Sequence, residues 1–567
     1  METQVLDAPI STTTLTVARP DLLYRVVLGV LLVVSVGVRL FGIGWGIPNF
    51  DAARMPTSAY RNSYHIDEDN FIWGLMQMRP SEGNFDIVDY HWGTLQFFLI
   101  DGVFLGAEAT GILPAPWETA FRDGDISAIG TMYELGRLIS VAAGVAGVFI
   151  VVALGTLAGG RRAGLGAGVA YALAPLAVVE AHYLTNDIVM SVLVAASLLA
   201  AARGAQRGHL GWLLAAGLLL GLAISDKYSA SFAAPAILLA QLFAWRTDRE
   251  RHNTLLPSLS YLILPWLAVL SGFVLGEPYL LFVPGKLIAG IHDTMNGNAA
   301  DPSLGLAPAI DMLKWQAENL GWLGLTLPLA ILALGGILIM IARCIYAPRT
   351  THRANRQVGQ NSELRTQNSE PGKATGAILL AALFGLILSL ALNRIFMLRY
   401  SQPLLPILSV AAGVGWASIP RPTLRWTAGV VAVVVAGLIT LGQLSLLAGP
   451  HPANELLAWL DTNLKPGQQV ARLWPEYPPL DGGSIKLIRL DPWHAVMPAG
   501  ADPDYIIMDN MALGPPDPTL TDLITTKYRE VVTFTAKPQV GPFTWDEGIT
   551  PHDWKYSHPT FTVYARR

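Results

Sequence analysis

Long apolar segments, separated by short polar stretches, occupy most of the chain before residue 448. A helix needs roughly 20 mainly apolar residues to cross a bilayer, and about 17 is the practical minimum. Eleven segments qualify, with ends defined to within several residues: 25–46, 136–158, 164–180, 186–202, 210–224, 229–245, 256–275, 320–342, 375–393, 402–418 and 426–447. The pattern predicts an all-α polytopic membrane protein with about 11 transmembrane helices, in which a tail, 1–24, precedes a transmembrane domain, 25–447.

The pattern changes after the last apolar segment, where prolines, polar residues and short alternating apolar runs begin. Five runs are typical of β-strands: 469–474, 485–490, 505–508, 530–533 and 560–564. Asn454 is placed to cap a helix before them. Residues 448–567 are therefore predicted to form a small soluble α/β domain. Because no glycine-rich phosphate loop marks it, a structural or acceptor-guiding lid is favoured over a second active site.

The composition supports the membrane class and narrows the partners. Hydrophobic residues make up 52% of the 567 residues, charged residues 14%, and the mean hydropathy is +0.42. A formal net charge of -4, with no basic stripe, gives no reason to expect nucleic acid as a partner. The one cysteine, Cys344, cannot form an internal disulfide.

Basic residues gather in alternate loops, which predicts the orientation because Lys and Arg are retained on the cytoplasmic side. The basic loops contain Arg161 and Arg162, Arg203 and Arg207, Arg246, Arg249 and Arg251, the linker at 343–374, and Arg421 and Arg425. This alternation predicts a multi-pass protein of the cell membrane with a cytoplasmic N-terminus. The first loop, 47–135, and the C-terminal domain would then be extracytoplasmic.

Residues 92–113 are apolar enough to span, but counting them as a span would reverse the side of every later basic loop. We therefore interpret this segment as re-entrant or interfacial. The first loop as a whole holds thirteen acidic residues against four arginines. Such a negative field calls for a cationic counterpart, either a divalent metal or arginines from elsewhere in the fold.

The first loop contains the best candidate for chemistry, the acidic run Tyr64-His65-Ile66-Asp67-Glu68-Asp69. Crowding carboxylates at a membrane surface is costly, so this cluster indicates a base, a phosphate-related role or a metal role. The alternative is a solvated loop that is simply acidic.

Two more charged residues lie where short extracytoplasmic turns are expected. Asp187 opens an apolar segment, so it is either a site residue or a helix-start residue stabilised by the first-turn amides. Lys227 is placed to hold an anionic lipid phosphate, unless Asp226 beside it merely neutralises its charge.

A third extracytoplasmic turn carries Arg394, Arg399 and Tyr400. Arginines on this side are disfavoured, so they require an explanation. One is a bound phosphate and the other is an ion pair with the acidic first loop.

All these residues are predicted to lie at one membrane face. A carboxylate there can take a proton from an acceptor hydroxyl, and cationic groups can stabilise a departing phosphate. The pattern therefore indicates transfer of a group from an anionic lipid to a hydroxyl.

Several motifs appear in one order along residues 25–420. They are His65-Ile66-Asp67-Glu68, Tyr90-His91-Trp92-Gly93-Thr94-Leu95, Leu135-Gly136-Arg137-Leu138-Ile139-Ser140, Gly159-Gly160-Arg161-Arg162-Ala163-Gly164, His182-Tyr183-Leu184-Thr185-Asn186-Asp187, Lys227-Tyr228-Ser229, and Arg399-Tyr400 followed by Pro403-Leu404-Leu405-Pro406. Together they resemble the GT-C superfamily of integral-membrane glycosyltransferases, which includes protein O-mannosyltransferases and aminoarabinose transferases. The chain departs from the protein mannosyltransferases at 91–95, where their Pro-Pro-Leu-Gly-Lys type sequence and its lysine are missing.

The resemblance implies a GT-C fold whose active site lies at the extracytoplasmic face and whose sugar donor is linked to a polyprenyl phosphate. It implies transfer to a hydroxyl of a protein, glycolipid or polysaccharide, with inversion by direct displacement. The implied catalytic residues are Asp67 as base, Glu68 in support and Asp187 as second acid, and the same three could hold a divalent metal. The implied donor-binding residues are Lys227, Arg399, Tyr400, His65 and His182.

Two other classes of function remain open. A transporter or flippase for lipid-linked sugars would also use charged groups, but usually in broken helices at the bilayer midplane. A non-catalytic envelope assembly protein could bind partners through the C-terminal domain and a cation through the acidic loop.

Overall fold

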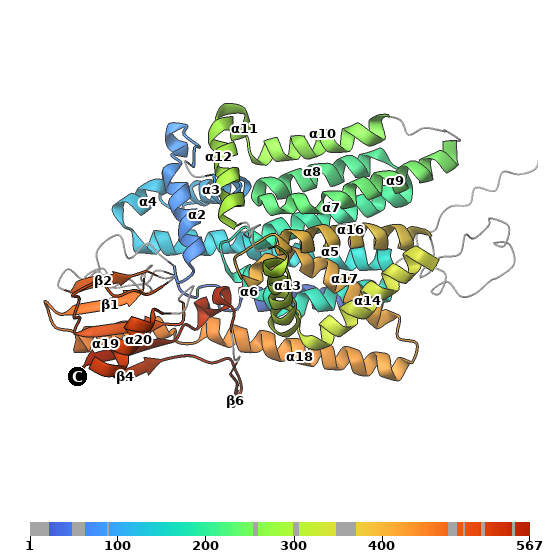
Figure 1. The fold of residues 1–567 in the computed structure, drawn as a ribbon. Helices are drawn as coiled ribbons and strands as arrows, with labels where there is room; N and C mark the ends of the chain where they lie inside the picture. Colours follow the sequence, from blue (N-terminus) through green and yellow to red (C-terminus); the bar gives the residue numbers. More distant parts are fainter. Residues whose placement is uncertain are drawn as a thin grey trace, which may run out of the picture.

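The computed structural model describes residues 22–47, 63–87, 90–252, 259–298, 305–346, 370–473, 485–491, 494–511, 516–546 and 550–567. Long helices run side by side, and a sheet-containing C-terminal domain adjoins one end of this bundle (Figure 1). We call that end of the bundle the domain end. The predicted fold class, a polytopic helical protein with a small α/β domain, is confirmed.

The helices that precede the C-terminal domain are α1 (Leu22–Leu40), α2 (Ile66–Gln77), α3 (Leu95–Ala109), α4 (Trp117–Asp123), α5 (Ile126–Leu173), α6 (Pro175–Val179), α7 (Asp187–Arg207), α8 (Leu210–Asp226), α9 (Ala234–His252), α10 (Leu259–Gly276), α11 (Tyr279–Phe282), α12 (Pro284–Asn298), α13 (Ala307–Asn319), α14 (Leu327–Tyr346), α16 (Glu370–Ala391), α17 (Leu405–Ala417) and α18 (Pro422–Ala448). Short turns of tighter or wider helix are η2 (Pro80–Glu82), η3 (Glu180–His182), η4 (Tyr228–Ala233), η6 (Leu320–Gly324) and η7 (Leu398–Leu404).

All eleven predicted spans coincide with helices, although only eight of the described helical stretches are by themselves long and apolar enough to cross a membrane. The difference has two causes. Helices α8 and α17 are 17 and 13 residues long, and η7 leads directly into α17. Helix α5 contains two predicted spans, because Gly160 has φ 86° and ψ 177° and breaks the helix between them. A Cβ at Gly155 would lie 2.9 Å from the Cα of Gly164, so the two halves fold back against each other.

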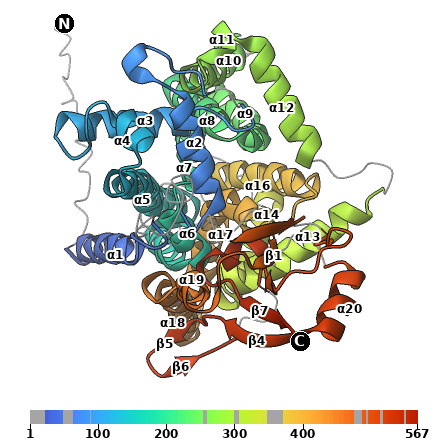
Figure 2. The ribbon, with the colours of Figure 1, turned by 90° about the vertical axis from the view of Figure 1, so that its left-hand side faces the viewer.

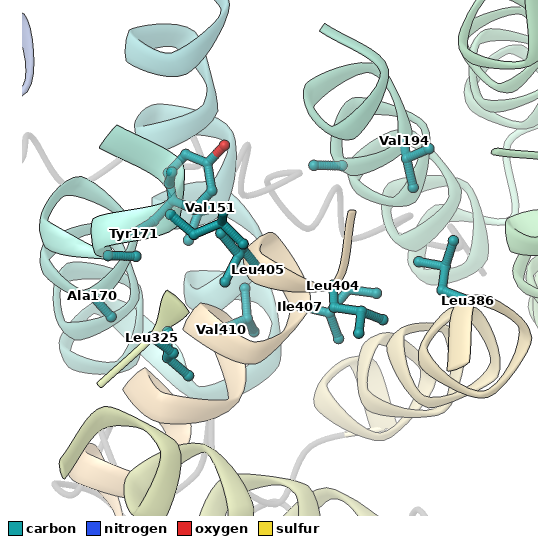
Figure 3. Packing of buried hydrophobic residues seen from close by; sticks show 14 of the residues in the cluster. Val151, Ala170, Tyr171, Val194, Leu325, Leu386, Leu404, Leu405, Ile407 and Val410 are labelled. Atoms are coloured by element: carbon teal, nitrogen blue, oxygen red, sulfur yellow. The ribbon is translucent and has the colours of Figure 1, made fainter. Parts of the chain in front are cut away.

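Helix α7 forms the centre of the bundle. Its 21 residues span about 30 Å, from Asp187 at the domain end to Arg207 at the opposite end. Its side chains pack against α5, α8, α9 and α16. Figure 3 shows part of this core, where Val194 of α7 lies near Leu386 of α16 and Ile407 of α17. Because α7 is about 30 Å long, the charged residues at its two ends lie about one membrane thickness apart.

Short helices in the segments that connect the long helices lie across the domain end of the bundle. Figures 1 and 2 show α2, α3 and α12 running across the ends of the long helices rather than alongside them. Helix α3 covers most of the 92–113 segment and has 15 residues, fewer than a bilayer span needs. This placement agrees with the interfacial interpretation of the segment.

The C-terminal domain contains α19 (Pro452–Asn463), β1 (Gln469–Leu473), β2 (Lys486–Leu490), β3 (Tyr505–Asp509), α20 (Pro518–Lys527), β4 (Tyr528–Phe534), β5 (Gln539–Val540), β6 (Phe543–Thr544), η8 (His552–Ser557) and β7 (Phe561–Arg566). Its five-stranded sheet has the order β2-β1-β3-β7-β4, with β1 parallel to β2 and β3, and with β7 antiparallel to both neighbours. The five predicted strands are therefore confirmed.

The predicted cap of α19 is wrong. The cap residue is His451, whose Nδ1 accepts the backbone N–H of Ala453 at 3.1 Å. Asn454 instead contacts the Tyr64 hydroxyl in the first loop. The domain thus touches the loop that carries the acidic cluster.

Two predicted polar segments lie mainly outside the described residues. These are the tail, of which only residues from 22 onward are described, and the linker, of which residues 347–369 are not described. Their predicted cytoplasmic location stays a prediction.

Candidate functional site

A pocket of about 560 Å³ opens at the domain end of the bundle, where loops that are distant in sequence meet. It is lined by Asp67, Phe71, His91, Trp92, Thr185, Asn186, Asp187, Met190, Lys227, Tyr228, Ser229, Asp293, Thr294, Gly297, Ser389, Leu390, Asn393, Arg399 and Tyr400. The lining contains five of the eight predicted site residues, namely Asp67, Asp187, Lys227, Arg399 and Tyr400. We call it the charged pocket.

The first ion pair of the pocket joins two consecutive bundle helices. Asp187 is the first residue of α7, and Lys227 directly follows α8, so both charges sit at helix ends. The Nζ of Lys227 lies 2.6 Å from Oδ1 of Asp187. Burial would lower the pKa of Lys227, but Asp187 and Tyr400 outweigh it and raise the pKa, so the lysine is held charged. Of the alternatives for Lys227, the direct ion pair is therefore with Asp187 and not with its sequence neighbour Asp226.

The second ion pair joins segments that are far apart in sequence. Asp67 lies in the first turn of α2, Arg399 lies in η7, and Nη1 of Arg399 is 2.5 Å from Oδ2 of Asp67. The Arg399 side chain is 8% exposed and that of Asp67 is 20% exposed. Of the two explanations for an arginine here, the structure contains the ion pair with the acidic loop. Both partners still face the pocket, so a ligand could reach either of them.

Tyr400 lies between the two cations. Its ring centre is 5.0 Å from Nζ of Lys227 and 5.8 Å from Cζ of Arg399. The face of an aromatic ring attracts a cation. Tyr400 therefore helps to hold both positive groups at one wall of the pocket without adding a negative charge.

Glu68 differs from its neighbour because it turns away from the pocket. Both carboxylate oxygens accept from Arg137 of α5, at 2.8 and 2.7 Å, and both side chains are fully buried. Glu68 also accepts from the Ser63 hydroxyl and the Leu184 backbone N–H, each at 2.6 Å. Burial would raise the pKa of Glu68, but Arg137 keeps it below the usual range. Glu68 therefore holds α2 against α5 and lies outside the charged pocket, where it can support Asp67 only by positioning its helix.

The two predicted histidines also lie away from the pocket. His65 is buried, with its ring centre 4.2 Å from that of Tyr183 and 4.4 Å from that of Tyr556. His182 is buried, and its ring nitrogens lie 2.8 Å from the Val178 carbonyl oxygen and 2.9 Å from the Phe41 carbonyl oxygen. Burial lowers the pKa of His65 to about 3 and that of His182 to about 4. Neither histidine lines the charged pocket, so this geometry gives no support to the predicted donor-binding role.

The predicted metal ligands do not converge. Asp67 pairs with Arg399, Asp187 pairs with Lys227, and Glu68 is bound by Arg137 outside the pocket. Within the described part of the chain, no three His, Cys, Asp or Glu side chains group as a metal site. The donor set expected from sequence therefore does not fit a metal.

Part of the pocket wall comes from residues that were not predicted as site residues. Trp92 stacks on Phe71 of α2, with ring centres 5.3 Å apart, and its carbonyl oxygen accepts the Tyr228 hydroxyl at 3.2 Å. The next residue must be small, because a Cβ on Gly93 would lie 2.0 Å from the carbonyl oxygen of Ser225. The glycine in the motif 90–95 was the available signal for this close approach.

The same segment is anchored by a buried carboxylate, Glu277, which follows α10. Its Oε2 accepts the backbone N–H of Thr94 at 2.9 Å, and burial raises the pKa of Glu277 to about 7. The folded protein binds the proton of Glu277 more tightly than the unfolded chain does. The resulting contribution to stability is therefore fully present below the unfolded pKa, and it is lost as the pH rises through the folded pKa.

We therefore expect the thermal stability of the detergent-purified protein to fall between about pH 4.5 and pH 7 because of Glu277, by at most about 3 kcal/mol. Glu277→Gln should flatten this part of the profile, whereas Glu82→Gln, at an exposed carboxylate of the first loop, should not. Melting temperatures of the three proteins from pH 4.5 to 8 measure the effect. Parallel profiles for wild type and Glu277→Gln would contradict it.

The fold and the pocket define a polytopic membrane protein whose paired charges gather at the ends of its spans. The family model described as dolichyl-phosphate-mannose-protein mannosyltransferase matches residues 128–275, which include Asp187 and Lys227. This match agrees with the resemblance of the motifs to the GT-C superfamily of integral-membrane glycosyltransferases.

The similarity to solved structures is remote. ArnT from Cupriavidus metallidurans, bound to undecaprenyl phosphate, is 13% identical with a TM-score of 0.43, over 95% of this chain and 97% of that chain. The oligosaccharyltransferase AglB from Archaeoglobus fulgidus, in complex with an inhibitory peptide and a dolichol-phosphate, is 12% identical with a TM-score of 0.46, over 94% and 77%. Both scores are below 0.5, so we draw no functional conclusion from them. No curated protein sequence matches the chain.

Proposed function

We propose that this protein is a glycosyltransferase that moves a monosaccharide from a polyprenyl-phosphate-linked donor to an acceptor hydroxyl. The observation that carries the proposal is the charged pocket itself, which two carboxylate–cation pairs, Asp67 with Arg399 and Asp187 with Lys227, line together. The printed name of the matching family, which refers to a dolichyl-phosphate sugar, supports the class of donor.

Lys227 and Arg399 are the proposed phosphate ligands. Each cation is paired with one carboxylate, so a phosphate that enters the pocket competes with Asp187 for Lys227 and with Asp67 for Arg399. An ammonium supplies a compact point charge and a guanidinium supplies a fork of donors, and both suit phosphate oxygens. Phosphate binding would therefore release the Asp67 carboxylate from Arg399 as it brings the sugar into place.

Asp67 is the proposed general base. It takes the proton of the acceptor hydroxyl while the acceptor oxygen bonds to the anomeric carbon of the sugar. The bond between that carbon and the phosphate oxygen breaks, and its electron pair leaves with the lipid phosphate. Lys227 and Arg399 stabilise the negative charge that develops there. Direct displacement from the opposite side inverts the anomeric configuration. Asp187 keeps Lys227 in position and no step requires a metal.

The pocket is proposed to face away from the cytoplasm. Helix α7 begins at Asp187 in the pocket and ends at Arg207, and basic residues are retained on the cytoplasmic side. The lipid donor would reach the pocket from the surrounding membrane, and the C-terminal domain would be extracytoplasmic.

Lys227→Ala should weaken binding of the donor lipid by about 10- to 100-fold, the loss expected for a charged hydrogen-bond partner. Lys286→Ala is the matched control, because Lys286 pairs with Asp86 outside the pocket. Affinity for a polyprenyl phosphate in detergent, measured for the three proteins, gives the comparison. Unaltered affinity of Lys227→Ala would remove Lys227 from the donor site.

The function itself is tested by transfer of radiolabelled sugar from a panel of polyprenyl-phosphate donors to membrane extracts by purified protein. Label incorporated by the wild type identifies the donor and, after fractionation, the acceptor. Movement of labelled lipid across proteoliposome membranes without transfer would overturn the proposal in favour of a transporter.

A further inference from the structure

A short helix of the C-terminal domain reaches the back of the charged pocket. Asp553, in η8, is 2% exposed, and its Oδ2 accepts the backbone N–H of Arg399 at 2.7 Å. Arg399 is the second residue of η7, whose own flanking residue Met397 supplies no side-chain cap. The carboxylate that satisfies the first turn of η7 therefore comes from the other domain.

The same helix also contacts the segment that carries Asp67. Tyr556 is 3% exposed, and its ring packs on His65, the residue that precedes α2. Its hydroxyl lies beside the guanidinium of Arg399. One turn of helix thus touches both segments that provide the second ion pair of the pocket.

A third contact holds η8 in place. Nε2 of His451 lies 3.0 Å from the carbonyl oxygen of Tyr556, and the His451 ring stacks on that of Tyr64 with centres 4.2 Å apart. His451 begins the C-terminal domain, so the contact ties the start of the domain to η8 and both to the first loop. The position of η8 is therefore determined by several buried contacts rather than by one.

We infer that η8 is a positioning element of the active site: through Asp553 and Tyr556, the C-terminal domain sets the separation of Asp67 and Arg399. This inference rests on the proposed function, in which these two residues act on the acceptor and on the donor phosphate. It gives the domain a positioning part in turnover, beside the structural or acceptor-guiding lid role expected from its sequence. Asp553 acts through the backbone of Arg399 and touches no reacting atom.

The test compares two substitutions of Asp553. Asp553→Ala removes the acceptor of the Arg399 N–H and should lower kcat by about 10- to 100-fold, since a misplacement of about 1 Å costs this much. The KM for the acceptor should stay unchanged. Asp553→Asn keeps an oxygen that can accept the N–H and should regain about half of the wild-type kcat. Asp502→Ala is the control, because Asp502 pairs with Arg566 on an exposed part of the same domain.

The inference is overturned if Asp553→Ala turns over like the wild type, or if a folded Asp553→Asn is as impaired as Asp553→Ala. If Asp553→Ala fails to fold, two substitutions of Tyr556 provide the test. Tyr556→Phe keeps the ring on His65 and should stay within about threefold of wild type, whereas Tyr556→Ala should lose about tenfold. Equal activity of these two variants would overturn the inference.

Binding of polyprenyl phosphate separates failure of this inference from failure of the proposed function. Absence of transfer by the wild type from every donor would reject the function. If Asp553 positions Arg399, Asp553→Ala should still bind the lipid phosphate about 5- to 10-fold more weakly than Asp553→Asn. Equal binding by the two variants would overturn the inference alone.

Discussion

Asp67→Asn is expected to lower kcat for sugar transfer by about 10² to 10⁴-fold, the contribution typical of a general base, because Asp187, the buried carboxylate of the described pocket lining, is held by Lys227. The amide has nearly the same shape but cannot take the acceptor proton. Its expression and detergent stability should stay close to wild type, since the amide oxygen of Asn can still accept a hydrogen bond from Arg399.

The matched control for Asp67 is Asp86→Asn. Asp86 belongs to the same loop and is also paired with a cation, Lys286, but it lies outside the pocket lining. Transfer of labelled sugar, with melting temperatures for all three proteins, separates loss of chemistry from loss of fold. Wild-type turnover by Asp67→Asn would remove Asp67 from the mechanism.

The adjacent carboxylate should give the opposite result. Glu68→Ala is expected to destabilise the protein by about 3–5 kcal/mol, because it leaves Arg137 buried without its partner. It also deprives the Ser63 hydroxyl and the Leu184 N–H of their acceptor. A large fall in melting temperature, with loss of folded protein on size-exclusion chromatography, is the expected observation.

A double substitution provides the control for this effect. Glu68→Leu together with Arg137→Met removes both charges and leaves apolar groups of similar size, so it should be more stable than Glu68→Ala. An unchanged melting temperature for Glu68→Ala would show that the buried pair does not hold α2 against α5.

The contrast between these neighbours shows what the sequence could and could not predict. Consecutive helical residues point about 100° apart, so only one of Asp67 and Glu68 can face a pocket on one side of α2. The sequence identified the cluster, but the choice between its members depends on where Arg137 lies. That charged residue inside an apolar span was the available signal for a buried partner.

Features set by local pattern were predicted well. The apolar segments and the five strands depend on side-chain periodicity within a few residues, and they match the observed helices and sheet. Asp187, Lys227 and Arg399 were predicted to lie together because they stand at the ends of spans that the positive-inside rule puts on one side, and all three line the charged pocket.

Features set by long-range packing were not predicted. His65 was expected in the pocket because it precedes Asp67, but aromatic side chains from two other segments enclose it. Asp553 gave no signal at all, because its contact with Arg399 depends on how the C-terminal domain docks. Local sequence carries little information about such docking.

The distance along the chain between the partners of the second ion pair has a consequence for biosynthesis. Ribosomes add about 5–20 residues per second, so roughly 20 to 60 s separate the synthesis of Asp67 from that of Arg399, and Asp553 follows later still. During this interval the first loop has already emerged, but neither the guanidinium nor the helix that orients it exists. The proposed site is therefore incomplete in the nascent chain until the last domain has docked.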